Sequence, residues 1–304
     1  MRRKFVLIPA FLCFVTNIFA QGGTVDTSQS IKSEILKREM SYSVYLPPDY
    51  AESNRPYPVL YLLHGMTGDH TDWVIKGEVN DIANNAILNG DAPPMIIIMP
   101  DGLWDAFYIN NYDGSIRWED FFYKEFIPHV EKKYRISANR NTRAISGLSM
   151  GGYGALYHAL KHHQMFKFCY SMSAAILERE PIKEGQELSE FERNFNLKTW
   201  GPMDKEGLPK NYKEHSVQEM VRAMDNYEPP KSTFPLPPKP GLPMFFIDCG
   251  DDDPLLKFNT NLVHLMKEKQ IPFEFRVRNG GHTWEYWRTG LRLAIKEIGG
   301  AFRD

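Results

Sequence analysis

The stretch Arg143–Leu156, RAISGLSMGGYGAL, decides how the rest of the chain is interpreted. A short strand ends in a Gly-x-Ser-x-Gly turn, and a helix with an apolar stripe follows from about Met150. Such a turn holds the hydroxyl of its central residue, Ser149, exposed at the tip. Gly147 and Gly151 fit the turn because side chains there would collide with the strand and the helix. We therefore predict that Ser149 is a nucleophile; the alternative is a glycine-rich turn without chemistry.

The composition of the 304-residue chain is typical of a soluble globular enzyme. Hydrophobic residues make up 42% and charged residues 24%, and 36 basic against 38 acidic residues give a net charge of −2. A nucleic-acid-binding protein needs concentrated positive charge, so we expect no nucleic-acid partner. No His/Cys/Asp cluster has the spacing of a zinc site, so neither a metal nor a cofactor is expected.

The first 20 residues have the features of a secretory signal peptide. Arg2-Arg3-Lys4 is basic, residues 5–15 are apolar, and Ala20 offers a small residue at the predicted cleavage site before Gln21. The apolar run is too short to span a bilayer, which makes a retained anchor the weaker alternative. Loss of the three basic residues lowers the net charge from −2 to −5. We predict an exported protein, periplasmic or extracellular, with no membrane contact once the leader is removed.

Two cysteines remain after the leader, Cys169 and Cys249, both in apolar strand-like runs. Export permits a disulfide between them. However, a bridge between neighbouring parallel strands demands unusual geometry, and a buried reduced cysteine behaves as a small hydrophobe. We expect two free thiols.

Apolar runs of strand length alternate with helical stretches along the mature chain. The polar residues 21–28 are expected to form an irregular, mobile start, and strands at 31–36 and 39–46 to form an antiparallel hairpin at a sheet edge. Further strands are predicted at 57–63, 95–99, 143–146, 166–172, 244–249 and 273–278. Helices are predicted at 80–88, 118–134, from 150, at 255–269 and at 285–298. Repeated β-α-β units imply an α/β fold, a mostly parallel sheet with helices on both faces, in a single domain over residues 21–304.

Residues 178–243 interrupt this alternation. Charged helical patches lead into the proline-rich PPKSTFPLPPKPGLP. The stretch is too long for an ordinary connection between two elements. We predict an insertion over the active-site face, in the manner of a partial lid.

His282 is the best candidate for the base that a catalytic serine needs. Groups that converge in a parallel sheet lie at the carboxyl ends of its strands. His282 directly follows the last strand, after two glycines that let the loop bend back. Other histidines fall on helices or polar loops, except His64, whose loop we assign to a backbone donor. The alternative for His282 is a loop histidine that bonds only to backbone.

The acid is expected in the loop Gly250-Asp251-Asp252-Asp253-Pro254. An acid between the serine and the histidine agrees with the chain order of Ser-Asp-His hydrolases. Some of these acids will serve only to cap the helix that follows. We choose Asp253, which lies deepest in the loop, and keep Asp251 and Asp252 open as alternatives.

Two backbone N–H groups are expected to bind the oxyanion. The residue after the nucleophile, Met150, supplies one, and Met66 in the glycine-bearing loop His64-Gly65-Met66 supplies the other. The alternative for that loop is that Gly65 only permits a turn.

These motifs together resemble the esterase D / feruloyl esterase family (carbohydrate esterase family 1) of α/β-hydrolases. The match covers most of the mature chain, through YSVYLPPDY, LLHGMTGD, IIMPDG, WEDFFYKEFIP, GLSMGGYGAL, DCGDDDPL and GGHTWEYW. The resemblance implies the α/β-hydrolase fold and a serine esterase that works without a cofactor. It also implies nucleophile Ser149, acid Asp253, base His282 and oxyanion amides of Met66 and Met150.

By this resemblance the substrate is an ester of feruloyl or acetyl groups on plant cell-wall polysaccharide such as xylan. Aromatic residues near the site in sequence could stack on a sugar or a phenolic ring; we single out Trp104, Tyr108 and Trp284. The alternative for each is ordinary core packing. Other functions stay open: a generic short-chain acyl or siderophore-lactone esterase, acyl transfer to a sugar as in mycolyltransferases, or a non-catalytic carbohydrate-binding relative. The sequence does not determine the oligomeric state.

Overall fold

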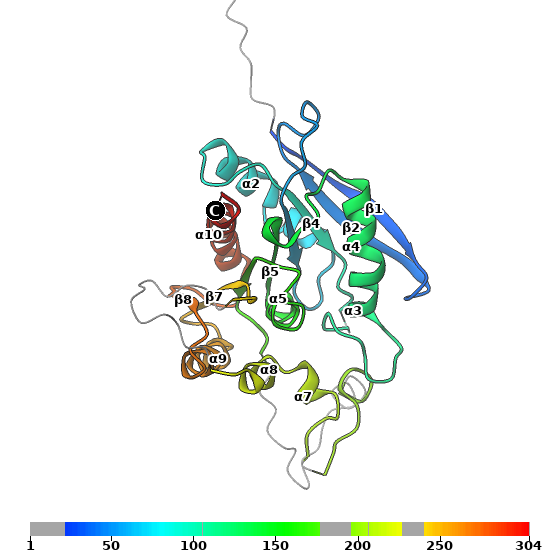
Figure 1. The fold of residues 1–304 in the computed structure, drawn as a ribbon, viewed down its shortest axis with the longest axis vertical. Coiled ribbons are helices and arrows are strands. Elements are labelled where there is room, and N and C mark those ends of the chain that lie inside the picture. The colour runs from blue at the N-terminus through cyan, green and yellow to red at the C-terminus, as the bar shows by residue number, and fades with distance from the viewer. Residues whose placement is uncertain (1–21, 105, 177–195, 206, 227–239, 304) are drawn as a thin grey trace, which may run out of the picture.

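An eight-stranded sheet forms the centre of the computed structural model, which describes residues 22–104, 106–176, 196–205, 207–226 and 240–303 (Figure 1). Its strand order is β1-β2-β4-β3-β5-β6-β7-β8. The strands are β1 (Thr24–Ser33), β2 (Arg38–Leu46), β3 (Val59–Leu63), β4 (Ile96–Pro100), β5 (Arg143–Leu148), β6 (Phe168–Met172), β7 (Met244–Gly250) and β8 (Phe273–Arg278). β2 pairs antiparallel with both of its neighbours, β1 and β4, and the strands β3 to β8 run parallel to one another, so the sheet is mostly parallel, as predicted.

The edge hairpin is confirmed, but its first strand is Thr24–Ser33 and not 31–36, since residues 34–37 form the turn, and the expectation of an irregular start through Ser28 is wrong. β1 already begins at Thr24, which pairs with Leu46, and a bulge lies between Asp26 and Gln29. Polar side chains at a sheet edge stay in water while the backbone pairs with β2, so the polar composition did not prevent a strand.

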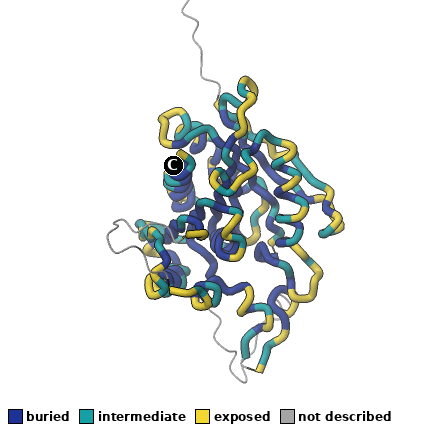
Figure 2. Tube along the Cα trace, in the orientation of Figure 1, coloured by how far each residue is buried: buried dark blue, intermediate teal, exposed yellow. Residues whose placement is uncertain are grey.

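Helices cover both faces of the sheet, as predicted. Alternate residues of each strand point to opposite faces, and each set joins its own buried cluster. One face packs against α3 (Trp118–Phe121), η1 (Phe122–Phe126), α4 (Ile127–Lys133), α5 (Met150–Lys161), α8 (Val217–Ala223) and α9 (Leu256–Glu268). The other packs against α1 (Asp72–Ile75), α2 (Val79–Leu88) and α10 (Trp284–Arg303). Figure 2 shows the buried residues along the strands and the helix sides that face them.

Three short helices complete the described chain: η2 (Arg140–Thr142), η3 (Asn196–Trp200) and α7 (Tyr212–His215). The predicted helix at 118–134 is continuous but contains a wider π-helical turn, η1.

The predicted insertion at 178–243 lies partly outside the described residues, which leave out 177–195, 206 and 227–239. Its described helix α8 packs against both α5 and α9, and α7 lies beside α8 on the side away from α9 (Figure 1). The leader also lies outside the described residues, so its cleavage and the domain boundaries remain predictions.

The two thiols are free and buried, as predicted. Cys169 pairs with Phe245 in the register of β6 and β7, whereas Cys249 stands four residues further along β7. Among the described residues, no helix is both long and apolar enough to cross a membrane.

Candidate active site

Ser149 stands on a strained turn between β5 and α5. Its backbone has φ 53° and ψ −117°, a region that costs a non-glycine residue about 1–3 kcal/mol. Three hydrogen bonds hold this conformation: Ser149 N–H donates to the Met172 carbonyl at 2.9 Å, and the Ser149 carbonyl accepts from the N–H groups of Tyr153 and Ala175 at 3.0 and 2.9 Å. The turn therefore presents the hydroxyl at the carboxyl edge of the sheet.

The glycines around Ser149 are required by close backbone contacts. A Cβ on Gly147 would lie 2.4 Å from the Gly151 carbonyl oxygen, and one on Gly151 would lie 2.5 Å from the His64 carbonyl oxygen. Only glycine allows the strand, the turn and the helix to approach this closely. The predicted reason is confirmed for Gly147, which leaves room for α5, whereas Gly151 leaves room for the backbone at the end of β3.

A hydrogen-bonded chain joins the three side chains predicted as catalytic. His282 Nε2 lies 2.9 Å from Ser149 Oγ, and His282 Nδ1 lies 2.9 Å from Asp253 Oδ2. The Asp253 side chain is fully buried, whereas that of His282 is 28% exposed. With Asp253 charged, the imidazole carries its proton on Nδ1, which leaves Nε2 to accept the serine proton.

Asp253 is suited to remain an anion. Burial alone would raise its pKa, but hydrogen bonds from His282, from the Leu255 N–H at 2.8 Å and from Ser173 together hold the pKa below its ordinary value. The two neighbouring acids are placed differently. Asp251 accepts the Gly280 N–H at 2.9 Å, and the Asp252 side chain is exposed. The geometry thus favours Asp253 as the partner of the imidazole.

The predicted oxyanion donors lie close to Ser149. A Cβ on Gly65 would lie 3.6 Å from Ser149 Cβ, so the loop that carries Met66 passes directly beside the serine. Met150 is the first residue of α5, where backbone N–H groups have no partner within the helix. Within the described residues, no acceptor bonds to either the Met66 or the Met150 N–H. Both amides are therefore available to an oxyanion at Ser149.

His64 orients the Met66 amide, a role that the sequence analysis did not assign. Its buried ring donates from Nδ1 to the Gly65 carbonyl at 2.7 Å, while Nε2 accepts from the Gly102 N–H at 2.7 Å. Since a trans peptide directs its C=O and N–H in opposite directions, fixing the Gly65 carbonyl also fixes the Met66 N–H. Burial lowers the pKa of His64, which keeps the ring neutral and able to accept at Nε2.

Trp287 and Ser173 contact two of the three predicted catalytic side chains, His282 and Asp253 respectively. The Trp287 ring meets the His282 ring edge-on at 4.8 Å, and its indole N–H donates to Ser173 Oγ at 3.1 Å. Ser173 hydrogen-bonds in turn to Asp253. Trp287 ends the motif GGHTWEYW, but its contact with His282 was not predicted, and Ser173 lies in no motif that marks it in sequence.

The three predicted substrate contacts have different environments. Trp104 is 50% exposed in the loop after β4, so it is accessible to a ligand. Tyr108 is fully buried and donates its hydroxyl proton to the His64 carbonyl at 2.8 Å. A buried side chain cannot contact a substrate, so Tyr108 has a structural role and not the predicted one. Trp284 packs edge-on against Trp73 and Trp287 at 5.3 and 5.4 Å and is partly buried.

No group of three His, Cys, Asp or Glu side chains that could hold a metal ion occurs in the described part of the chain. The chemistry available from the residues present is that of a serine nucleophile with an imidazole base and two amide donors.

The chain is similar in sequence and in fold to known esterases. The family model named Esterase matches residues 33–233. A solved ferulic acid esterase superposes with a TM-score of 0.75 at 31% identity, covering 92% of this chain and 99% of that one. The acetyl esterase of Caldicellulosiruptor saccharolyticus is 24% identical over 273 residues, 87% of this chain and 94% of its own. The endo-1,4-beta-xylanase/feruloyl esterase of Xylanibacter ruminicola is 32% identical over 159 residues, which are 50% of this chain and 22% of that protein.

Proposed function

The chain belongs to the Esterase family and is a carboxylic ester hydrolase with the α/β-hydrolase fold; from this premise we propose that it removes feruloyl or acetyl groups from plant cell-wall xylan. The observation that carries the proposal is the hydrogen-bonded chain from Ser149 through His282 to Asp253. Ferulic acid esterase and acetyl esterase relatives support the two acyl groups, and the xylanase fused to one relative supports the polymer.

The proposed mechanism follows from the positions of the groups. His282 Nε2 takes the proton of Ser149 as its oxygen attacks the ester carbonyl, and Asp253 stabilises the imidazolium that forms. The Met66 and Met150 amides bind the tetrahedral oxyanion. His282 then protonates the departing alcohol, and water hydrolyses the acyl-enzyme through a second such state.

Export of the mature protein is part of the proposal, because xylan cannot enter a cell. The basic and apolar leader supports it. Expression of the full chain in a bacterial host, with N-terminal sequencing of the secreted product, tests the point: a mature N-terminus at Gln21 is expected, and an uncleaved cell-associated chain would contradict export.

Hydrolysis of methyl ferulate, acetylated xylan and a short-chain aryl ester by one preparation tests the substrate. The proposal expects kcat/KM for one of the two plant-type substrates to match or exceed that for the aryl ester. A Ser149→Ala variant supplies the baseline for each substrate. A strong preference for the aryl ester over both others would favour a generic short-chain esterase instead.

A further inference from the structure

Ser173, the first residue after β6, has a strained backbone. Its φ is 46°, in the left-handed region that favours glycine. The residue is nevertheless fully buried, and its N–H donates to the Asp248 carbonyl at 2.7 Å. Strain of this kind persists only where the surrounding structure holds it, and it is concentrated at functional sites. Ser173 is therefore a candidate for a role beyond packing.

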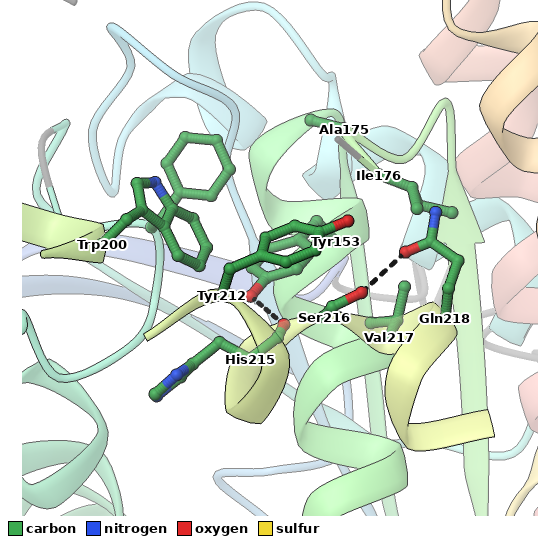
Figure 3. Close-up of a pocket in the computed structure, with 10 residues that line it drawn as sticks. Tyr153, Ala175, Ile176, Trp200, Tyr212, His215, Ser216, Val217 and Gln218 are labelled. Atoms are coloured by element: carbon green, nitrogen blue, oxygen red, sulfur yellow. Dashed lines mark hydrogen bonds between the residues drawn. The ribbon is translucent and has the colours of Figure 1, made fainter. Parts of the chain in front are cut away.

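The residues that follow Ser173 are fixed to the turn at Ser149. The Ala175 N–H donates to the Ser149 carbonyl at 2.9 Å. Ala175 and Ile176 then line a small pocket beside α5 (Figure 3). Because these contacts are made by the backbone and by other side chains, removal of the Ser173 hydroxyl leaves them intact.

The neighbours of the Ser173 hydroxyl determine the direction of its proton. The indole N–H of Trp287, which can only donate, lies 3.1 Å from Ser173 Oγ. Cys249 also hydrogen-bonds to Ser173, and burial raises the pKa of its thiol to about 12, so the thiol keeps its proton and can donate. The Asp253 carboxylate can only accept. The Ser173 hydroxyl therefore donates to Asp253.

Asp253 thus receives three hydrogen bonds from three different residues. Its Oδ2 faces His282 Nδ1 at 2.9 Å, and its Oδ1 accepts the Leu255 N–H at 2.8 Å. The third donor is the Ser173 hydroxyl. A hydrogen bond to a carboxylate stabilises its charged form and weakens its attraction for a proton. Ser173 is the donor of the three that can be removed without a change to the imidazole or to the start of α9.

The charged pair Asp248 and Arg278 lies next to Ser173 on β7 and β8. Arg278 Nε donates to Asp248 Oδ2 at 2.9 Å, and the hydroxyls of Tyr170 and Tyr286 also donate to this carboxylate. The two opposite charges largely cancel each other. The charge that the Ser173 hydroxyl faces is that of Asp253.

We propose that Ser173 is a positioning residue, whose hydroxyl donates to the Asp253 carboxylate and through it sets the orientation and the basicity of His282. The proposal rests on the esterase chemistry of Ser149 and deepens it. Without the hydroxyl, the carboxylate is free to rotate and attracts the imidazole proton more strongly. Substrate binding is unaffected, because Ser173 is fully buried.

Ser173→Ala, assayed with an aryl acetate, tests this role. Per active site, counted by titration with an aryl phosphonate, kcat is expected to fall by about 10-fold at unchanged KM. The midpoint of the acidic limb of kcat/KM should move to higher pH by about half a unit, because Asp253 stabilises the protonated imidazole more strongly. Ser173→Gly also lacks the hydroxyl but relaxes the backbone, so it should show the same shift in a chain that folds without the strain.

Ser171→Ala is the matched control. Ser171 is an equally buried serine, but its hydroxyl donates to the Gly152 carbonyl at 3.0 Å and not to an acid. This variant should keep the wild-type kcat and acidic limb. In an Asp253→Asn background, Ser173→Ala should change kcat by less than about 2-fold, because the carboxylate through which the hydroxyl acts is gone.

A wild-type acidic limb in both Ser173 variants, or the same shift in Ser171→Ala, would overturn the role of Ser173 and leave the esterase function standing. An undiminished loss on adding Ser173→Ala to Asp253→Asn would do the same. A wild type that does not hydrolyse the aryl acetate would overturn both.

Discussion

Gly250 and Gly280 meet backbone to backbone: a Cβ on Gly250 would lie 2.0 Å from the Gly280 carbonyl oxygen. The same carbonyl accepts the Asp252 N–H at 3.1 Å, and the Gly280 N–H donates to Asp251 at 2.9 Å. These contacts fasten the loop after β7, which carries Asp253, to the loop after β8, which carries His282. The distance between Asp253 and His282 thus depends on Gly250, whose lack of a side chain lets the two loops meet.

Replacing Gly250 with alanine should separate these two loops. A methyl group cannot fit 2.0 Å from a carbonyl oxygen, so the backbone must shift and the Asp253–His282 hydrogen bond must lengthen. We expect kcat to fall by roughly 10²-fold, as misplacement of a catalytic group by about 1 Å can do. Steady-state kinetics on an aryl ester measure the effect.

Gly300→Ala is the matched control for that substitution. Gly300 lies within α10, and a Cβ there would meet nothing within 4 Å. The variant should keep wild-type kinetics and gain about 0.5–1 kcal/mol in unfolding free energy, because alanine forms helix better than glycine. Equal kinetics of the two variants would refute the role of Gly250.

Asp253→Asn should lower kcat by roughly 10²–10⁴-fold, because a neutral amide no longer stabilises the imidazolium or selects the Nδ1–H tautomer. Asp252→Asn makes the same chemical change at an exposed neighbouring residue and should change kcat by less than about 2-fold. Kinetics of both variants at pH 7 show whether Asp253 or Asp252 is the acid that pairs with His282. A larger loss in the Asp252 variant would return the assignment of the acid to the alternatives that the sequence left open.

His64→Ala should weaken oxyanion binding without removing any catalytic side chain. The Gly65 carbonyl loses its imidazole donor, so the Met66 amide is no longer held in place. We expect kcat to fall by about 10²-fold, near the cost of one lost oxyanion donor, with KM little changed. His64→Asn, which can still donate to the carbonyl, should recover part of the rate. The exposed His264→Ala is the control. An increase in KM alone would indicate a different role.

Much of this architecture could be predicted because apolar runs and glycines leave clear signals. Tyr57 to Leu63 is apolar throughout because β3 is buried on both faces, and Gly147 and Gly151 mark the turn at Ser149. Edge strands leave a weaker signal. Residues 24–28 are mostly polar, and it is the backbone pairing of residues 24–26 with β2 that brings them into the sheet.

Contacts made through the fold left no local signal. Ser173, directly after β6, hydrogen-bonds to Asp253, and Trp287 in α10 packs against His282; neither contact could be recognised before the strands were placed. Tyr108 was singled out because it lies near the site in sequence, but its side chain points into the core. His64 offered the one usable signal: a histidine directly after a buried strand and before a glycine.

Glu119 links α3 to α5, the helix that begins directly after Ser149. It accepts hydrogen bonds from Tyr157, Lys161 and His162 at 2.7 to 2.9 Å and is 6% exposed. Burial alone would raise its pKa, but the bonds from His162 and Lys161 hold the pKa well below the ordinary 4.5. Because the folded-state pKa is depressed, this stabilisation is complete above about pH 4.5 and is lost as the pH falls toward the folded-state value.

Glu119→Gln should therefore lower the unfolding free energy at pH 7 by about 1–3 kcal/mol, since it weakens three bonds to a buried anion. The difference between wild type and variant should shrink between pH 5 and pH 3, where the wild-type carboxylate gains its proton more readily in the unfolded chain. Urea unfolding at several pH values measures this. The exposed Glu52→Gln should follow the wild type at every pH, and a gap between wild type and Glu119→Gln that stays constant down to pH 3 would contradict the proposed charge of Glu119.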